Sequence, residues 1–352
     1  RGMSSAASDV YKRQPMDSSE AKSAAELRII KEIQDLGLSD YVAELDEKGF
    51  TVIPPDIACP NGLDKRLLEG ILRVSEERSG IKPDLKNGST HQNFGATELA
   101  EKNKDLGLGV ESTDGISNDS PIGEFLPSLI FEGQVFEDAL MNPVLLAMST
   151  YLLGYQCVMS SMTAFVKGPN KVNLDLHCDT LLPNPLPDHA LVCNCTYALT
   201  DYNKENGSIA FVPGSHKKNR APNKSETTLS KDSNAIHIDA KAGSLIIFHG
   251  ACWHGAYNRT AKGLRVTMPV LMARTYMRTE ENLCEIVPDE MLKRNGPRFP
   301  ILMQQGHFYS VTDYRKQPER KEKMYKFYES YNKSIDGVLD SGPVSYTHLR
   351  AH

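Results

Sequence analysis

The sequence lacks any apolar run that could span a membrane, and it lacks an excess of basic charge. A transmembrane helix needs about 20 consecutive apolar residues, and the best candidate, LVCNCTYAL at 191–199, is too short and too interrupted. The 40 Lys and Arg are outnumbered by 45 Asp and Glu, which gives a formal net charge of −5. We therefore expect no membrane span and no general affinity for nucleic acid.

Cysteines are few, and they do not form a recognisable framework. There are seven, an odd number for a set of disulfides, and Cys193-x-Cys195 has no second pair at zinc-ribbon spacing. Small buried thiols in a reducing compartment are the better interpretation. The region after Met16 is rich in helix formers and lacks the apolar core of a secretory signal, so the predicted location is cytoplasmic.

Length and composition favour one globular domain. The chain has 352 residues, of which 40% are hydrophobic and 24% charged, and it shows no repeat and no clear linker. The ends, residues 1–15 and 344–352, do not continue the neighbouring patterns and look like translated sequencing-adapter sequence. We predict a single domain over residues 16–340, with Met16 as the expected start.

The order of expected elements indicates the fold class. Residues 16–154 are mostly helical, including an amphipathic helix at 62–82 and one helix over 133–153 that ends at Gly154. Residues 155–275 are dominated by short strands and turns, and 276–340 return to helix. The polar stretch 83–125 is either a lid over the site or a disordered insertion. This order predicts a mainly β protein, an antiparallel two-sheet jelly roll with flanking helices.

A possible metal-binding pattern begins with His177-Cys178-Asp179. Side chains at i and i+2 of an extended segment point to the same face, so His177 and Asp179 can reach one ion. His254 follows the expected buried strand SLIIF, and Gly250 and Gly255 allow the chain to approach closely around its imidazole. Two imidazoles and one carboxylate on one face of a metal suit non-haem Fe(II) in oxygen-using enzymes.

Arg265 and Thr267 form a second pair at i and i+2, within the strand-like run GLRVTMPVL. An arginine fork can grip a carboxylate through two hydrogen bonds, and the threonine hydroxyl can add another. His249 is a weaker candidate than His254 for the third ligand. His216 fits better as part of a turn, Pro213 to His216, than as a ligand.

Between the proposed ligands runs DYNKENGSIAFVPGSH, residues 201–216, which resembles the phytanoyl-CoA dioxygenase family of Fe(II)/2-oxoglutarate-dependent oxygenases. The stretches YVAELDEKGFTVIPP and NPVLLAMSTYLLGYQCVMSS upstream, and Trp253-His254-Gly255, Asn258 and Arg265 downstream, are similar to that family in the same order. The resemblance covers roughly residues 40–275. It implies a cupin-like double-stranded β-helix with iron ligands His177, Asp179 and His254. Arg265 would anchor the distal carboxylate of 2-oxoglutarate, with Thr267 as a helper.

The resemblance implies an Fe(II)/2-oxoglutarate-dependent dioxygenase whose cofactors are Fe(II), 2-oxoglutarate and O2. Such an enzyme would hydroxylate an unactivated C–H bond of a small organic or lipid-derived substrate and release succinate and CO2. Two alternatives stay open: a cupin-like metal enzyme that does not use 2-oxoglutarate, and a non-catalytic jelly-roll binding module. The sequence leaves undecided the substrate, acyl-CoA or other, the residues at the keto-acid end of 2-oxoglutarate, and the oligomeric state. Four lysines expected near the barrel mouth could meet phosphates or only solvent: Lys167, Lys171, Lys217 and Lys218.

Overall fold

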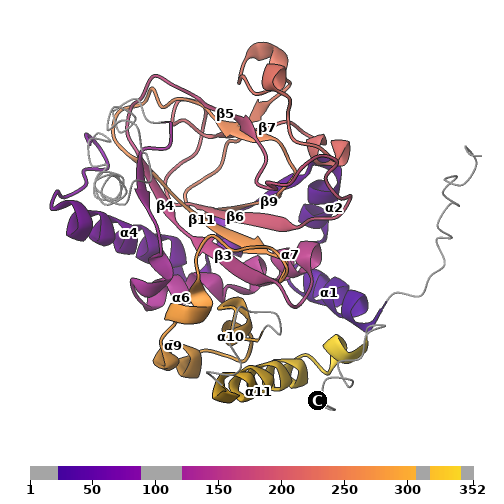
Figure 1. The fold of residues 1–352 in the computed structure, drawn as a ribbon. Helices are drawn as coiled ribbons and strands as arrows, with labels where there is room; N and C mark the ends of the chain where they lie inside the picture. Colours follow the sequence, from indigo (N-terminus) through magenta and orange to yellow (C-terminus); the bar gives the residue numbers. More distant parts are fainter. Residues whose placement is uncertain (1–22, 89–120, 307–317, 342–352) are drawn as a thin grey trace, which may run out of the picture.

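The computed structural model describes residues 23–88, 121–306 and 318–341. Two antiparallel β-sheets face each other, and helices cover the outer face of the larger sheet (Figure 1). The prediction of a mainly β jelly-roll core with flanking helices is confirmed. Within the described residues the two sheets share no hydrogen-bonded strand pair, so the barrel is not closed.

The larger sheet has seven strands in the order β1-β9-β6-β11-β4-β2. The seventh strand, β3, pairs with the second half of β11, and β4 pairs with the first half. The strands are β1 (Phe50–Ile53), β2 (Glu124–Leu126), β3 (Val158–Met162), β4 (Ala164–Lys167), β6 (Val192–Ala198), β9 (Ser244–His249) and β11 (Arg265–Ala273).

Alternation along the central strands separates the helical core from the space between the sheets. On β11, the side chains of Val266, Met268, Val270 and Met272 belong to the main hydrophobic core under the helices. Their neighbours on the same strand, Arg265, Thr267, Pro269 and Leu271, line the cavity between the sheets. This is the period of two that a strand buried on both faces requires. The inner face can therefore carry polar chemistry while the outer face supplies the apolar packing.

The smaller sheet has the order β5-β10-β7-β8, with β5 (Leu174–His177), β10 (His254–Ala256), β7 (Ile209–Phe211) and β8 (Ile236–His237). His254 lies between His177 on β5 and Phe211 on β7. Phe211 in turn stacks on Phe50 of the larger sheet, with ring centroids 4.3 Å apart. This contact fixes the spacing of the two sheets beside the candidate site.

The helices mostly have clear start and stop signals. Helix α1 (Ala24–Asp35) begins with a capping box in which the Ser23 and Glu26 side chains cap each other's backbone N–H groups. Helix α2 (Ser39–Lys48) ends at Gly49, whose φ of 86° is left-handed. The remaining α-helices are α3 (Pro55–Ala58), α4 (Leu63–Ser79), α6 (Gln134–Leu140), α7 (Pro143–Leu153), α8 (Leu283–Ile286), α9 (Asp289–Arg294), α10 (Arg298–Leu302) and α11 (Pro318–Ser334). Single-turn 3-10 helices are η1 (Pro60–Gly62), η3 (Leu129–Phe131), η4 (Ser215–Lys218), η5 (Lys224–Glu226), η6 (Lys231–Ser233) and η7 (Val338–Ser341).

The prediction of one helix over 133–153 is wrong, because the segment is divided into α6 and α7. Pro143 has no backbone N–H to continue the first helix, and it pushes the residue before it out of the helical region. Asn142 has a ψ of 122°, and its side chain accepts a hydrogen bond from the Val144 backbone N–H as the cap of α7. Helix α7 then packs on β6 and β9.

Several sequence predictions fall outside the described residues. The two ends, 1–15 and 344–352, lie there, as does most of the 83–125 stretch, so its role as a lid stays a prediction. None of the described helices is both long and apolar enough to cross a lipid bilayer.

Candidate active site

Three side chains that could hold a metal ion meet at the inner face of the smaller sheet. His177 ends β5, Asp179 follows it in the adjoining loop, and His254 opens β10 directly opposite His177. The Nε2 atoms of His177 and His254 lie 3.9 and 3.4 Å from Asp179 Oδ1. One ligand atom from each residue lies within 4.8 Å of the others. Small side-chain movements would bring all three donors to bond lengths of about 2.1 Å from one ion.

Backbone carbonyls orient both imidazoles. His177 Nδ1 lies 2.8 Å from the Asp175 carbonyl oxygen, and His254 Nδ1 lies 3.0 Å from the Cys252 carbonyl oxygen. A carbonyl oxygen can only accept, so each Nδ1 carries the proton and donates it. The lone pair of each Nε2 is then free and faces Asp179. Metal-binding histidines are held in this way in known sites.

The electrostatics keep the carboxylate ionised. Burial alone would raise the pKa of Asp179, but the nearby His254 and His177 hold that pKa below its ordinary value. Burial and the neighbouring His254 lower the pKa of His177. Burial acts against the charged form of His254 as well, yet Asp179 raises the pKa of His254 overall. Asp179 is thus the negative partner of two imidazoles, as a cation site requires.

Asn194 and Thr196 were missed by the sequence reasoning. Asn194 Nδ2 donates to Asp179 Oδ2 at 3.3 Å, and the Thr196 hydroxyl donates to Asn194 Oδ1 at 2.8 Å. Both come from the inner face of β6, two residues apart, and both line the cavity. They fix the second carboxylate oxygen from the opposite sheet. The alternation of LVCNCTYAL could have placed them on one face, but no residue motif connects them with Asp179.

Arg265 and Thr267 lie on the inner face of β11, where the sequence predicted that they share a face. Arg265 is only 4% exposed. Its Nη1 donates to the Gly207 carbonyl oxygen, and its guanidinium carbon lies 5.3 Å from the centre of the Tyr202 ring. Arg265 Nε has no hydrogen-bond partner in the part of the chain that the structure describes. A buried guanidinium with a free N–H is suited to an anionic ligand.

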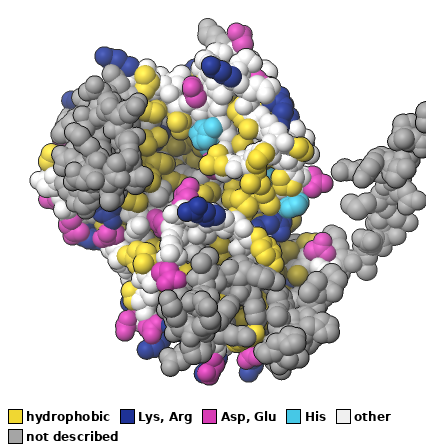
Figure 2. Space-filling view, in the orientation of Figure 1, with side chains coloured by type: hydrophobic (Ala, Val, Ile, Leu, Met, Phe, Trp, Pro, Cys, Tyr) yellow, Lys and Arg dark blue, Asp and Glu magenta, His cyan; other side chains and the backbone are white. Residues whose placement is uncertain are grey.

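A cavity of about 410 Å³ connects these groups. Figure 2 shows it as a hollow with largely hydrophobic walls and a histidine on its surface. Both proposed cofactor residues and all three metal-binding side chains line it. The apolar part of the lining comes from Ile122, Phe125, Phe165, Leu174, Leu181, Ile209, Phe248 and Leu271.

The expectation that four lysines lie near this mouth is wrong for Lys167, which is fully buried. Among the described residues Arg265 is the only lysine or arginine in the cavity lining. Lys218 instead lies over the Trp253 ring, 4.1 Å from its centre. Where these lysines lie depends on strand register and turn geometry, and the sequence spacing of the lysines does not determine either.

His249 and His216 stay apart from the three metal-binding groups. His249 ends β9, and its Nδ1 accepts a hydrogen bond from the Ala251 backbone N–H at 3.0 Å. Burial lowers the pKa of His249 to about 4. Its ring centre lies 5.3 Å from that of His216, which belongs to η4. Both therefore serve as uncharged packing groups beside the site.

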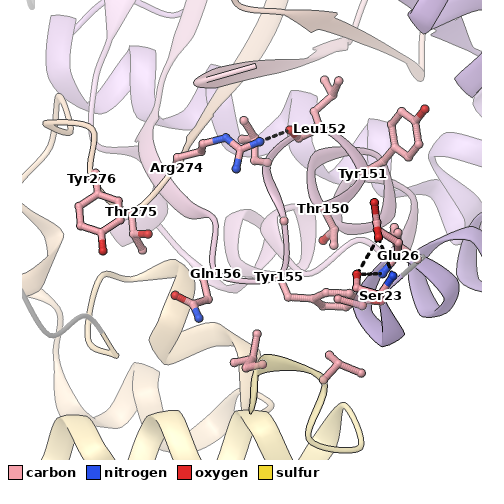
Figure 3. A pocket seen from close by; sticks show the side chains of 16 residues that line it. Ser23, Glu26, Thr150, Tyr151, Leu152, Tyr155, Gln156, Arg274, Thr275 and Tyr276 are labelled. Atoms are coloured by element: carbon pink, nitrogen blue, oxygen red, sulfur yellow. Dashed lines mark hydrogen bonds between the residues drawn. The ribbon is translucent and has the colours of Figure 1, made fainter. Parts of the chain in front are cut away.

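A second hollow, of about 550 Å³, lies on the helical side of the molecule (Figure 3). Its walls come from α1, the end of α7, the segment after β11 and η7. Arg274 Nε donates to the Ala190 carbonyl oxygen and its Nη2 to that of Leu152, while Ser23 and Glu26 cap α1. These three polar side chains thus already have structural roles. The metal-binding group of three described above is not part of it.

Two imidazoles and one carboxylate at the common cavity of two facing antiparallel sheets could hold one metal ion, in the ligand set that non-haem oxygenases use. Residues 113–267 match the model of the phytanoyl-CoA dioxygenase family. That segment contains all three metal-binding side chains together with Arg265 and Thr267. The resemblance to the phytanoyl-CoA dioxygenase family that the sequence predicted is therefore confirmed over these residues.

Curated relatives are similar over part of the chain. Dioxygenase af480 of Aspergillus fumigatus is 29% identical over 195 residues, which are 53% of this chain and 60% of that protein. Dioxygenase peniF of Penicillium patulum is 30% identical over 96 residues, 27% of this chain and 29% of that protein. The matches thus span no more than about 60% of the length of these relatives.

Among solved structures, HygX from Streptomyces hygroscopicus with nickel, 2-oxoglutarate and hygromycin B bound superposes with a TM-score of 0.49 and 16% identity. The match covers 71% of this chain and 93% of that one. The epimerase SnoN in complex with Fe3+, alpha ketoglutarate and nogalamycin RO gives a TM-score of 0.46 at 14% identity. That match covers 69% of this chain and 84% of SnoN.

Proposed function

We propose that the protein is an Fe(II)/2-oxoglutarate-dependent dioxygenase that hydroxylates a C–H bond of a small organic substrate. The observation that carries the proposal is the meeting of His177, Asp179 and His254 in a cavity that Arg265 also lines. The residues fit the metal, because both Nε2 lone pairs face one ionised carboxylate. They fit the cosubstrate, because Arg265 is buried and its Nε–H has no partner among the described residues.

Each residue has a proposed role in this reaction. His177, Asp179 and His254 hold the metal on one side and leave adjacent positions open toward the cavity. Arg265 binds the distal carboxylate of 2-oxoglutarate, and Thr267 adds a hydroxyl on the same face. Bound Fe(II) and 2-oxoglutarate would supply the activation of O2, with succinate and CO2 as the products of the cosubstrate. The protein places the substrate and excludes water.

The cavity lining supports a largely apolar substrate. Its walls are mostly aliphatic and aromatic, and its volume of about 410 Å³ is that of a small-molecule site. Glu280 is a carboxylate in the lining outside the metal-binding set, and it accepts a hydrogen bond from the Ser161 hydroxyl. Among the described residues no lysine lines the cavity to hold phosphates. We therefore favour an uncharged or donor-bearing small molecule over an acyl-CoA held by a basic pocket.

The test is succinate formation from 2-oxoglutarate by the Fe(II)-loaded protein, measured with a panel of small apolar candidate substrates. We expect succinate to depend on Fe(II), O2 and a substrate, and to be lost in Asp179→Ala. The matched control is His249→Ala, which removes a buried neighbouring histidine outside the metal-binding set and should retain turnover if the protein folds.

The open alternatives give different results. Iron binding without any use of 2-oxoglutarate would favour a cupin-like enzyme with another reaction. The absence of specific metal binding would favour a jelly-roll binding module.

A further inference from the structure

Arg265 of the cavity lining belongs to a cluster of three buried cationic side chains, and among the described residues no carboxylate is paired with any of them. Lys167 is 0%, Arg265 4% and Arg259 5% exposed. Lys167 and Arg265 are directly paired residues on β4 and β11, so their side chains leave the sheet on the same face as close neighbours. Arg259 comes from the segment between β10 and β11.

These cations are bound to neutral groups rather than to acids. Lys167 Nζ donates to the Tyr257 carbonyl oxygen at 2.9 Å. Arg259 donates to the carbonyl oxygens of Gly263 and Lys262 and to Asn206. Arg265 donates to the Gly207 carbonyl oxygen. Among the described residues no carboxylate forms an ion pair with any of the three, and buried charges without partners are unfavourable.

The other groups packed against Lys167 do not supply the missing negative charge. Tyr202 lies against Arg265, and Lys204 lies over the Tyr257 ring. Glu124 is on the adjacent strand β2, but it accepts a hydrogen bond from Ser75 of α4, on the helical face of the sheet. The cluster of Lys167, Arg259 and Arg265 thus reaches the cavity through Arg265, and an anionic ligand in the cavity could contact it there.

We propose that Lys167 is neutral when the cavity is empty and takes up one proton from solvent when the dianion 2-oxoglutarate binds against Arg265. The Lys167 nitrogen forms a new N–H bond as a buffer acid in the solvent gives up its proton, and the resulting ammonium balances the second negative charge of the ligand. Lys167 is a positioning residue in this reaction, since it acts through its charge and does not line the cavity. The inference rests on the proposed function, because it requires 2-oxoglutarate at Arg265.

The protonation equilibrium is consistent with this. Burial, with the charges of Arg265 and Arg259, lowers the pKa of Lys167 to about 6. Burial and Arg265 also lower the pKa of Arg259 to about 10. An anion beside Arg265 offsets part of this repulsion and raises the pKa of Lys167. Proton uptake on binding then makes affinity fall as pH rises between the free and the bound pKa, by at most about tenfold per pH unit.

The experiment is titration calorimetry of the Mn(II)-loaded protein with 2-oxoglutarate, in two buffers of different ionisation enthalpy at one pH near 7.5. The difference in heat gives the number of protons taken up. We expect up to one proton for 2-oxoglutarate and almost none for 2-oxobutyrate, which keeps the metal-binding keto acid but lacks the distal carboxylate. Lys167→Met should abolish the uptake and flatten the pH dependence of 2-oxoglutarate binding.

The outcomes separate the inference from the proposed function. Tight binding of 2-oxoglutarate with no proton uptake by the unaltered protein overturns the role of Lys167 and leaves the dioxygenase proposal standing. Equal uptake in Lys167→Met also overturns it. Binding of Mn(II) with no binding of 2-oxoglutarate at any pH contradicts the proposed function itself. The measurements on the unaltered protein decide the matter even if Lys167→Met does not fold.

Discussion

Asn194 offers the sharpest test of how the metal-binding set is held. Asn194→Ala removes the amide that donates to Asp179 Oδ2 at 3.3 Å and releases the Thr196 hydroxyl from its acceptor. Asp179 lies on a loop, so this contact from β6 orients its carboxylate. Loss of such a partner weakens metal binding by about 10- to 100-fold in known sites, which corresponds to about 1.4–2.7 kcal/mol.

The assay is a competition titration of Mn(II) or Co(II) against a chelator of known affinity, with folding checked by circular dichroism. Thr196→Val should give a smaller loss, because Asn194 can still donate to Asp179. The matched control is Asn295→Ala, since the Asn295 amide also donates to a carboxylate, that of Glu137, but in the helical layer. It should reduce stability without changing metal affinity. An Asn194→Ala protein with unaltered metal affinity would refute the reasoning.

Three further predictions concern the cosubstrate, the turn after β9 that contacts the loop carrying Asp179, and a buried acid. Arg265→Met should raise the KM for 2-oxoglutarate by about 100-fold, because the charged hydrogen bonds between Arg265 and the distal carboxylate are lost. Steady-state succinate formation measures this KM. An unchanged KM would show that Arg265 does not bind the cosubstrate. Gly250→Ala places a Cβ 2.1 Å from Val192 Cγ2 and 2.9 Å from Thr180 Oγ1, so urea unfolding should show a loss of about 1–3 kcal/mol. Gly296→Ala, where an added Cβ meets no atom of the described residues within 4 Å, should cost much less, and equal losses would contradict the packing argument. Burial raises the pKa of Glu124 to about 7, so folding favours its protonated form and stability should fall as pH rises from about 4.5 to 7. Glu124→Gln should therefore be more stable than the unaltered protein at pH 8, by about 2–3 kcal/mol at most. Urea unfolding of both proteins at pH 5 and pH 8 tests this. An equal difference in stability between the two proteins at both pH values would exclude the proton linkage.

The spacing of Arg265 and Thr267 was informative because strands have a period of two. His177 and Asp179 also converge at this spacing, although Asp179 lies just past the end of β5. That rule places i and i+2 on one face without knowledge of the fold. The convergence of His254 with them depended on the resemblance, because no local rule relates residues 75 positions apart. Their roles as ligands and anchor stay predictions until they are measured.

The positions that sequence reasoning missed depend on strand pairing. Asn194 reaches Asp179 only because the two sheets face each other, and Lys167 is buried only because β4 pairs with β11 in this register. A lysine near a polar segment reads as exposed when the partner strand is unknown. By contrast, the break between α6 and α7 was available in the sequence, since Asn142-Pro143 is a local signal for a new helix start.

The most direct test of the account is an equilibrium titration of the unaltered protein with one divalent metal ion, compared with His177→Ala, Asp179→Ala and His254→Ala. The account predicts one ion per chain and, for each substitution, a loss of affinity of about 100-fold or more, with His249→Ala close to unaltered. Binding that persists undiminished in Asp179→Ala, or no stoichiometric binding by the unaltered protein, would contradict it.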